Sequence, residues 1–585
     1  MGSYNYYKMF GCFNRKFKIS ESEPPPDVRE AFWRFTEGDS EMTPDQLLKF
    51  MVHHQREESC TAADVESIMN HVLHRRYHSD TRRNFTLEDF FYFLFQDDLN
   101  GPIFPKVHHD MTAPLHHYYI YTGHNSYLTG NQLSSDCSET PIVKALENGV
   151  RGIELDLWPN SAGDKVHVLH GRTLTTPVPL LKCLKSIKEH AFVKSPYPVI
   201  ITLEDHLTPQ LQAKVAQMAM STFGDMLYCP ESGILEEFPS PESLKHKVIL
   251  STKPPKEYLG ASNITVENNS SPSPLPNEKE SSDEDQEPEP DPDIDPGDKS
   301  EGDDEDTDSS NKKPEATEYK RLIAIHASNA KNKGLRQVLR VSHDRARRLS
   351  LSEQELERAA SLYATDVVRF TQHHILRVFP KGARVNSSNF RPTIGWIHGA
   401  QMVAFNMQGY GKSLWMMQGM FRSNGGCGYL KKPDILMKQS SAGEALDPRL
   451  PWPVRKTLKV VVYMGDGWRL DFSHTHFDAF SPPDFYTKIY IWGVPADNAK
   501  GKTRIIEDDW APYWDEEFKF PLRIPELALL RIEVREYDRS DKDDFGGQTS
   551  LLVSDLRPGF RAVPLYDKKG HKFKSVRLLL RFQFE

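Results

Sequence analysis

The sequence holds few cysteines and no long apolar run, and these two absences narrow the compartments in which the protein can work. The six cysteines are scattered, without CxxC or zinc-ligand spacing: Cys12, Cys60, Cys137, Cys183, Cys229 and Cys427. This usage predicts a reducing compartment. No apolar stretch reaches the ~18 residues that a membrane-spanning helix needs, and the first residues lack the apolar core of a signal peptide. We therefore expect a cytoplasmic protein that meets any membrane from the cytosolic surface.

Charge is low overall but unevenly distributed. The 585 residues carry a formal charge of −9, yet Glu278–Asp308 alone holds 17 acidic residues against two lysines, a local charge of −15. The rest of the chain therefore carries +6. The surrounding segment has almost no aromatic or β-branched residues, so it cannot bury enough apolar surface to offset its ordering entropy. We predict an acidic disordered linker over residues 261–318.

Basic residues form no stripe with interleaved aromatics, so we expect no nucleic-acid partner. Near the N-terminus, Cys12 lies among four basic residues of the first eighteen. A reversible acyl group on Cys12 is one interpretation. A disordered basic tail over residues 1–27 is the interpretation that we favour.

The length predicts about four domains, and the first folded block covers residues 28–98. Apolar residues recur there at helical spacing, and Thr43 and Thr86 each begin a pattern typical of a capped helix start. The paired helices resemble an EF-hand lobe, but no D-x-D-x-D-G calcium loop precedes either start. We expect a helical scaffold without metal.

Short apolar runs separated by room for helices follow in two blocks, residues 106–253 and 319–438. Eight runs are candidate strands: Tyr119–His124, Val150–Asp156, Val166–His170, Val199–Glu204, Val248–Ser251, Leu322–His326, Ile375–Phe379 and Met402–Asn406. Eight strands alternating with helices predict a (β/α)8 TIM-like barrel. The acidic linker would interrupt this barrel between its fifth and sixth strands.

From residue 453 to residue 585 the pattern becomes all-β. Five segments alternate polar and apolar residues between turns rich in Asp and Gly: Leu458–Tyr463, Tyr486–Trp492, Glu517–Phe520, Leu530–Glu536 and Val576–Phe582. They predict a β-sandwich. The predicted fold class is therefore a multidomain α/β chain with a helical lobe, an interrupted barrel and a C-terminal sandwich.

Polar residues stand at the carboxyl ends of the first four candidate barrel strands, where barrel enzymes place their active sites. In strand order they are His124 and Asn125, Glu154 and Asp156, His170, and Glu204. Two acids on one face of an apolar strand are costly unless a cation lies between them. Three carboxylates and an amide oxygen suit calcium or magnesium. Histidines beside such a site suit acid–base catalysis.

Six motifs allow a comparison with known families. They are Gly123-His124-Asn125-Ser126-Tyr127-Leu128, Gly152-Ile153-Glu154-Leu155-Asp156-Leu157-Trp158, His170-Gly171, Leu203-Glu204-Asp205-His206, Asn386-Ser387-Ser388-Asn389-Phe390 and Asn424-Gly425-Gly426-Cys427-Gly428-Tyr429. Together they resemble both halves of the catalytic barrel of phosphoinositide-specific phospholipase C, called X and Y. Only 27 residues precede the helical block, so the layout resembles the plant-type enzymes, which have no N-terminal pleckstrin-homology domain.

The resemblance implies calcium-dependent hydrolysis of membrane phosphatidylinositol phosphates to diacylglycerol and inositol phosphates, in intracellular signalling at the cytosolic face of the plasma membrane. The inositol 2-hydroxyl would attack phosphorus through a cyclic phosphate intermediate. His124 would stabilise charge on the phosphate, Glu154 would take the hydroxyl proton, and His170 would protonate the leaving oxygen. The calcium ligands implied are Asn125, Glu154, Asp156 and Glu204.

The same resemblance implies substrate contacts from Lys253, Ser350, Arg377 and Phe379. Two positions depart from the animal relatives, which carry a second lysine at Ser251 and a tyrosine at Phe379. Because one ammonium group is missing, we expect looser discrimination between singly and doubly phosphorylated headgroups.

The sandwich resembles a C2 domain with acidic loops, whose candidate calcium ligands are Asp484, Asp508, Glu536 and Asp538. Calcium would let these loops approach an anionic membrane that contains phosphoinositides. We expect a monomer.

Two alternatives remain open at this point. The first is a catalytically inactive adaptor that binds calcium and phosphoinositides, although such a protein has no need to keep both histidines and every metal ligand. The second is a barrel phosphodiesterase for glycerophosphodiesters, which does not explain Lys253 together with Arg377.

Overall fold

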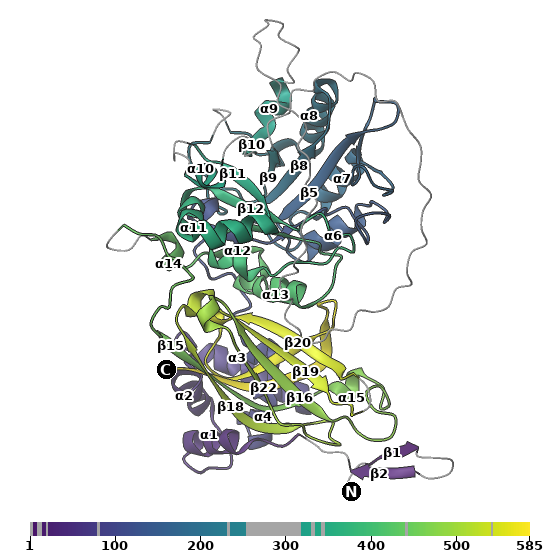
Figure 1. Ribbon diagram of the computed structural model, residues 1–585. Helices are drawn as coiled ribbons and strands as arrows, with labels where there is room; N and C mark the ends of the chain where they lie inside the picture. Colours follow the sequence, from purple (N-terminus) through teal and green to yellow (C-terminus); the bar gives the residue numbers. More distant parts are fainter. Residues whose placement is uncertain are drawn as a thin grey trace, which may run out of the picture. The chain divides into compact units, whose positions relative to one another are not determined.

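A computed structural model describes residues 4–8, 14–18, 22–78, 82–230, 235–252, 317–328, 334–340, 345–438, 443–539 and 542–585. Cys12, Lys253 and the predicted acidic linker up to residue 316 lie outside these ranges. The described residues form a helical lobe, a barrel and a β-sandwich (Figure 1). In these ranges, no helix is both long and apolar enough to cross a bilayer.

Two described stretches of the N-terminal tail, residues 4–8 and 14–18, form strands where we predicted disorder. Strands β1 (Tyr4–Lys8) and β2 (Asn14–Lys18) pair antiparallel. Tyr7 is only 1% exposed, and its hydroxyl accepts a hydrogen bond from Trp510 Nε1 of the sandwich at 3.0 Å. We predicted disorder from the basic composition, which does not reveal this aromatic contact. The contact buries apolar area and so stabilises the strand pair.

In its described residues the N-terminal lobe has five helices: α1 (Pro26–Thr36), α2 (Pro44–His53), α3 (Ala62–Tyr77), α4 (Leu87–Leu94) and α5 (Asp97–Asn100). Thr43 and Thr86 cap α2 and α4 through reciprocal capping boxes, which confirms both predicted helix starts. A short antiparallel bridge between Met42 and Phe85 links the two helix pairs. In the part of the lobe that the structure describes, no group of metal-ligating side chains gathers.

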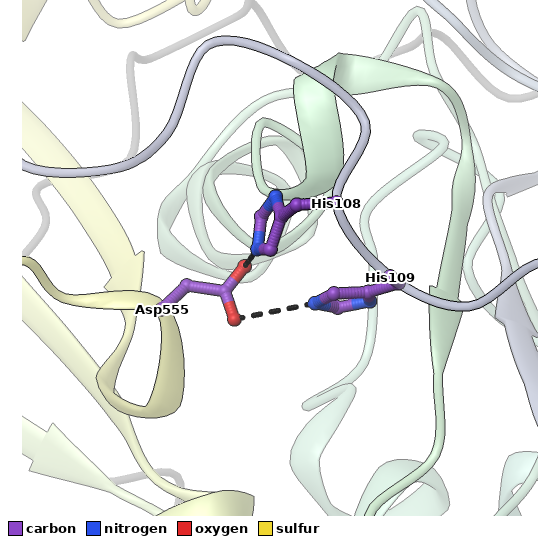
Figure 2. A group of neighbouring side chains, drawn as sticks. All are labelled: His108, His109 and Asp555. Atoms are coloured by element: carbon purple, nitrogen blue, oxygen red, sulfur yellow. Dashed lines mark hydrogen bonds and ion pairs between the residues drawn. The ribbon is translucent and has the colours of Figure 1, made fainter. Parts of the chain in front are cut away.

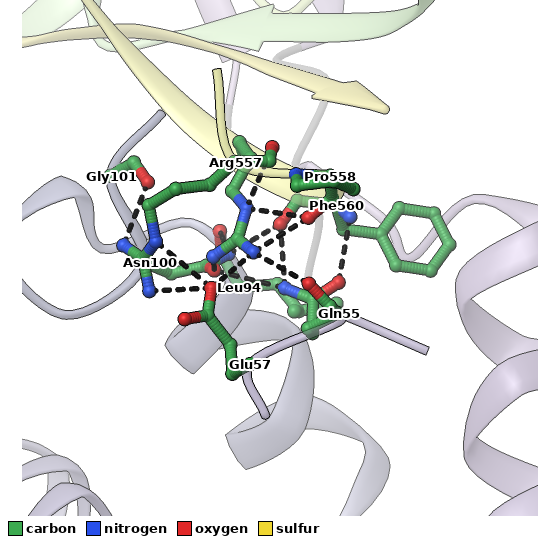
Figure 3. A network of polar contacts seen from close by, with 9 residues as sticks. Gln55, Glu57, Leu94, Asn100, Gly101, Arg557, Pro558 and Phe560 are labelled. Carbon is green, nitrogen blue, oxygen red and sulfur yellow. Dashed lines mark hydrogen bonds and ion pairs between the residues drawn. The ribbon is translucent and has the colours of Figure 1, made fainter. Parts of the chain in front are cut away.

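The lobe is fastened to the sandwich by a buried polar network (Figure 3). Glu57 Oε1 lies 2.7 Å from Arg557 Nη2 and 2.5 Å from Arg561 Nη2. Gln55 accepts from the backbone N–H of Phe560 at 2.7 Å and donates to its carbonyl oxygen at 2.7 Å. Apolar side chains of the lobe share one cluster with sandwich residues: Val461, Tyr463, Met464, Phe560 and Leu579. The lobe is therefore a scaffold packed on the sandwich.

Eight parallel strands form the barrel. They are β4 (Thr122–Gly123), β5 (Gly152–Pro159), β8 (Val199–Asp205), β9 (Val248–Thr252), β10 (Ile323–His326), β11 (Arg348–Ser352), β12 (Ile375–Phe379) and β13 (Met402–Phe405). Their order is β10-β9-β8-β5-β4-β13-β12-β11, and a parallel bridge between Ala327 and Arg348 joins the two ends. The predicted TIM-like barrel is confirmed.

Three strands differ from the prediction. Strand β6 (Val166–Val168) pairs antiparallel with β5 and β7 (Val178–Pro179); its polar alternation fits a half-exposed hairpin rather than a buried parallel strand. Strand β11 takes its place in the barrel. The first predicted strand is divided into β4 and β3 (Tyr118–Ile120), and β3 pairs antiparallel with β14 (Tyr429–Lys431).

These differences move the linker to a place between the fourth and fifth barrel strands. The helices that accompany the barrel are α6 (Thr140–Glu147), α7 (Leu180–His190), α8 (Pro209–Phe223), α9 (Thr317–Leu322), α10 (Leu335–Leu339), α11 (Glu353–His373), α12 (Thr393–Ile397), α13 (Lys412–Met420) and α14 (Asp434–Met437). Their apolar faces and the outward faces of the strands form one buried cluster, which leaves the inward strand faces to build the site.

The C-terminal domain is an antiparallel sandwich. Its elements are β15 (Lys456–Asp466), α15 (Trp468–Asp471), β16 (Phe485–Trp492), β17 (Ala499–Lys502), β18 (Tyr513–Leu522), β19 (Leu529–Glu536), β20 (Asp544–Leu552), β21 (Gly559–Tyr566) and β22 (Lys572–Phe584). Strand β20 meets β21 at Gln548 and Tyr566, the one pair in register between these strands in the described part of the domain. All five predicted strands are present.

His54 gives the junction between lobe and sandwich a pH dependence. Its ring stacks between Phe50 and Phe560, with centroids 5.1 and 5.0 Å away, and burial lowers its pKa from 6.5 to about 4. The folded state therefore disfavours the protonated ring, so stability that is present above pH 6.5 is lost as the pH falls towards 4. We expect His54→Phe to remove roughly 1–3 kcal/mol of this acid destabilisation.

Thermal unfolding of both proteins across this pH range measures the effect. The exposed neighbour His53 offers a control, because His53→Phe should leave the acid destabilisation unchanged. Equal acid sensitivity in His54→Phe and the parent protein would contradict the assignment.

Candidate active site

The carboxyl ends of neighbouring strands bring the predicted acids together. Asp156 on β5 lies directly beside Glu204 on β8, and carboxylate oxygens of Glu154, Asp156 and Glu204 lie within 4.8 Å of one another. Glu154 and Asp156 are buried, whereas the Glu204 side chain is 51% exposed. Glu204 is therefore the member of the group that solvent reaches most.

The buried cation Arg377 only partly offsets these charges. Arg377 on β12 is 5% exposed, and its Nη2 lies 2.5 Å from Glu154 Oε2. Burial, and then the charges of Glu204 and Glu154, raise the pKa of Asp156 well above its usual range, and nearby Tyr127 and Arg377 oppose this shift less strongly. Asp156 Oδ1 has no hydrogen-bond partner among the described residues. An orphaned carboxylate oxygen beside two further carboxylates fits a divalent cation with hard oxygen ligands.

Asn125 joins this group from the loop after β4. Its backbone adopts a left-handed conformation, with φ of 41°, and its N–H donates to Glu154 Oε2 at 3.2 Å. The side-chain nitrogen Nδ2 donates to Gln132 Oε1 at 2.8 Å. The carbonyl oxygen Oδ1 is thus the side-chain atom of Asn125 that can coordinate a cation.

Both predicted histidines are anchored through the same ring nitrogen. His124 Nδ1 donates to Asn406 Oδ1 at 2.9 Å, and His170 Nδ1 donates to the main-chain oxygen of Gln132 at 2.7 Å. Nε2 is therefore the nitrogen that can take up or release a proton in each ring. Burial lowers the pKa of His124, which favours its neutral form in the protein without substrate.

Three of the four predicted substrate contacts lie on β11 and β12. Ser350 and Arg377 are paired in register, and Phe379 follows two residues later, with the Arg377 guanidinium carbon 5.3 Å from its ring centroid. Ser350 Oγ is buried without a hydrogen-bond partner among the described residues. Ser251 is fully buried, and its hydroxyl donates to the Ile325 carbonyl at 3.0 Å. Lys253 lies outside the described residues.

Sequence patterns did not single out Gln132 and Asn406, which hold the predicted site residues in place. Gln132 Nε2 donates to Asn406 Oδ1 at 3.1 Å and to Ser387 Oγ at 2.8 Å. Asn389 in turn accepts the Asn406 N–H at 2.8 Å. The motif around Ser387 and Asn389 carried the family resemblance, but its sequence does not show which residues of the first half it contacts.

A second cluster of metal-ligating side chain types lies away from the barrel mouth (Figure 2). Nε2 of His108 and of His109 lie 3.7 and 3.4 Å from the two oxygens of Asp555. His109 Nδ1 accepts the backbone N–H of Lys431 at 3.2 Å, so the proton of a neutral ring resides on Nε2. A metal at Nε2 would need that proton to move to Nδ1, where it would meet the N–H of Lys431. This cluster is therefore a hydrogen-bonded junction between barrel and sandwich.

The candidate C2 ligands lie close together but do not form a compact group. Asp484 Oδ1 accepts the backbone N–H of Asp508 at 2.8 Å. Burial raises the pKa of Glu536 to about 8, with further contributions from Asp544, Asp484 and Asp478. In the ranges that the structure covers, neither these acids nor Asp538 form a set of three ligand oxygens within 4.8 Å. Calcium binding by these loops stays a prediction.

The fold and the site together define a barrel enzyme that carries acid–base histidines, a group of carboxylates and a buried arginine for an anionic substrate. Family patterns match three segments: the phosphatidylinositol-specific phospholipase C X domain at residues 111–254, its Y domain at residues 321–435, and the C2 domain at residues 456–567.

Curated relatives match along the whole chain. Phosphoinositide phospholipase C 6 of Arabidopsis thaliana is 62% identical and covers 100% of this chain and 98% of its own length. Phosphoinositide phospholipase C 4 of the same plant is 55% identical over 100% of this chain and 99% of its own. The crystal structure of S. officinalis PLC21 shares the fold, with a TM-score of 0.71 and 24% identity over 96% of this chain and 68% of that one.

The chain therefore belongs to the phosphoinositide-specific phospholipase C family. It is an enzyme that hydrolyses phosphoinositides, and it matches two plant relatives over 98% and 99% of their length.

Repulsion within the carboxylate group predicts a stabilising substitution. In a buffer with a chelator, Asp156→Asn removes one buried negative charge, and we expect the free energy of unfolding to rise by about 0.5–2 kcal/mol. Chemical denaturation measures this change. Asp164→Asn alters an exposed aspartate and serves as the control. A loss of stability in Asp156→Asn would show that the acids do not strain the barrel mouth.

Proposed function

We propose that this enzyme requires calcium and cleaves phosphatidylinositol phosphates by attack of the inositol 2-hydroxyl, through a cyclic phosphate, to give diacylglycerol and inositol phosphates. One observation carries the proposal: three carboxylates lie within 4.8 Å of one another, while His124 and His170 are both anchored through Nδ1. This arrangement provides acid–base groups beside a set of cation ligands.

The residues that would hold calcium are Asn125, Glu154, Asp156 and Glu204. Their donor set consists of oxygen atoms alone, which suits calcium, and the orphaned Asp156 oxygen supports the fit. Bound calcium supplies a positive charge that lowers the pKa of a hydroxyl group and offsets charge on the phosphate.

Two side chains, Glu154 and His170, carry out the proton transfers. A carboxylate oxygen of Glu154 accepts the proton of the inositol 2-hydroxyl. At the same time the inositol 2-oxygen forms its bond to phosphorus. His170 Nε2 gives a proton to the diacylglycerol oxygen as the P–O bond breaks. In the second step His170 takes a proton from water as the water oxygen bonds to phosphorus. The bond between phosphorus and the inositol 2-oxygen then breaks, and Glu154 returns its proton to that oxygen.

His124 acts on the phosphate oxygens. Its ring is neutral before the substrate arrives, because burial lowers its pKa. An anionic phosphate nearby favours the protonated form, whose Nε2–H then donates to a phosphate oxygen. Asn406 keeps the ring in place during this change through the bond to Nδ1.

Headgroup recognition would use Arg377, Ser350 and Phe379, with Lys253 as a further cation. Ser350 is the hydroxyl that β11 can offer, because the other serine of this strand, Ser352, caps α11 by accepting the Glu355 N–H. The Ser251 hydroxyl donates to a backbone oxygen, so this side chain does not replace the missing ammonium group. This supports looser discrimination between headgroups.

Membrane contact would involve the barrel rim and the C2 domain. Leu133 and Leu174 are 49% and 84% exposed, and the Leu174 N–H donates to the Leu133 carbonyl at 2.8 Å. These leucines flank Gln132 and the loop that carries His170, so insertion of their side chains would bring lipid to the site. We propose peripheral association with the cytosolic face of the plasma membrane.

An inactive adaptor has less support than an enzyme. The carboxylates gather at one place, and further buried residues orient both His124 and Asn125. A protein that only bound lipid would not require fixed histidine tautomers.

Substitution of His170 tests the two-step reaction. We expect His170→Gln to lower kcat by about 10²–10⁴-fold, with cyclic inositol phosphate forming a larger share of the residual product. Phosphorus NMR of the products from phosphoinositide vesicles measures that share. His167→Gln, on the neighbouring hairpin strand, is the control. An unchanged rate or product ratio in His170→Gln would contradict the assigned role.

A further inference from the structure

Gln132 is a buried amide at the barrel mouth that none of the reaction steps above uses. Only 6% of this residue is exposed, yet its side chain forms three hydrogen bonds and its main chain two. We propose that Gln132 is a positioning residue. It orients the ligand oxygen Oδ1 of Asn125 and the reactive nitrogen Nε2 of His124 and of His170. This inference rests on the proposed function.

The first contact sets the metal ligand. Gln132 Oε1 accepts from Asn125 Nδ2 at 2.8 Å. A carboxamide is planar, so holding Nδ2 in this direction fixes Oδ1 on the other side. If the Gln132 oxygen were missing, the amide of Asn125 could turn and present its NH₂ group, which cannot coordinate a cation. Gln132 thereby determines which side-chain atom of Asn125 faces the cation site.

The second contact sets the tautomer of His124. Gln132 Nε2 donates to Asn406 Oδ1 at 3.1 Å, and the Asn406 nitrogen Nδ2 donates to the Ser388 carbonyl at 3.2 Å. Both bonds turn the Asn406 oxygen towards His124, whose Nδ1 must then be the donor. Nε2 remains as the nitrogen for the phosphate.

The third contact uses the main chain. The Gln132 carbonyl oxygen accepts from His170 Nδ1 at 2.7 Å, and the Gln132 N–H donates to the Val385 carbonyl at 2.8 Å. His170 is thus held by an atom that a side-chain substitution does not remove.

Gln132 also joins the two halves of the barrel. Asn125 and His170 belong to the half before the linker, whereas Ser387 and Asn406 belong to the half after it. Gln132 contacts all four. The position therefore couples the cation ligands of one half to the polar support of the other.

Three variants separate these contacts. Gln132→Met keeps the length of the side chain and removes both polar arms. Gln132→Glu keeps an acceptor for Asn125 but has no donor for Asn406. Gln408→Met is the matched control, because Gln408 also donates to Ser387 Oγ, at 3.3 Å, without contacting Asn125, His124 or His170.

Calcium binding is measured from the calcium-dependent rise in melting temperature, with Asp156→Asn as the reference that lacks the barrel site. We expect Gln132→Met to weaken calcium binding and to lower kcat, each by about 10–100-fold. Gln132→Glu should lower kcat over a similar range while binding calcium no more weakly than the parent protein. KM for vesicle substrate should hardly move.

Two results would overturn the inference. One is that Gln132→Met and Gln408→Met have the same kcat and calcium affinity. The other is that calcium binding, kcat and the metal-free melting temperature all fall together in both Gln132 variants, which is the pattern of a purely structural residue. If the parent protein hydrolysed its substrate fully in a chelator, the calcium proposal would fail, and kcat of Gln132→Glu against Gln408→Met would still decide the role towards His124.

Discussion

Repulsion among Glu154, Asp156 and Glu204 is the constraint around which the barrel mouth is built. Oxygens of three carboxylates lie within 4.8 Å, and two of these side chains are buried. Arg377 offsets part of the charge through its ion pair with Glu154. The net negative charge that remains is the charge that a divalent cation with oxygen ligands would neutralise.

The rest of the mouth can be understood from this constraint. Ligands that repel one another hold their positions only if neighbouring groups fix them, and here those groups come from both halves of the barrel. The loop after β4 folds back to Glu154 through the Asn125 N–H, while Asn406 and Ser387 reach the site from the second half. Hydrogen bonds thus unite two segments that the acidic linker separates in sequence.

The barrel and its site could largely be predicted from the sequence because buried parallel strands are continuous apolar runs, and polar residues at their ends stand out. The pattern failed where this contrast is weak. Strand β11 carries Arg348 and Ser350 among its buried or half-buried residues, so it does not resemble an apolar strand. Strand β6 alternates regularly but belongs to a half-exposed hairpin.

The supporting residues could not be predicted for a different reason. Gln132 and Asn406 are ordinary polar residues in sequence, and their contact joins positions 274 residues apart. Periodicity reports local structure, whereas such contacts arise from the tertiary fold.

A crystal structure of the protein grown with calcium and a soluble inositol phosphate tests the central claim most directly. We predict anomalous density for one calcium ion bound by Asn125, Glu154, Asp156 and Glu204, with the headgroup phosphates near Arg377. An empty carboxylate group beside a bound headgroup, or an ion held at His108, His109 and Asp555 instead, would contradict this assignment.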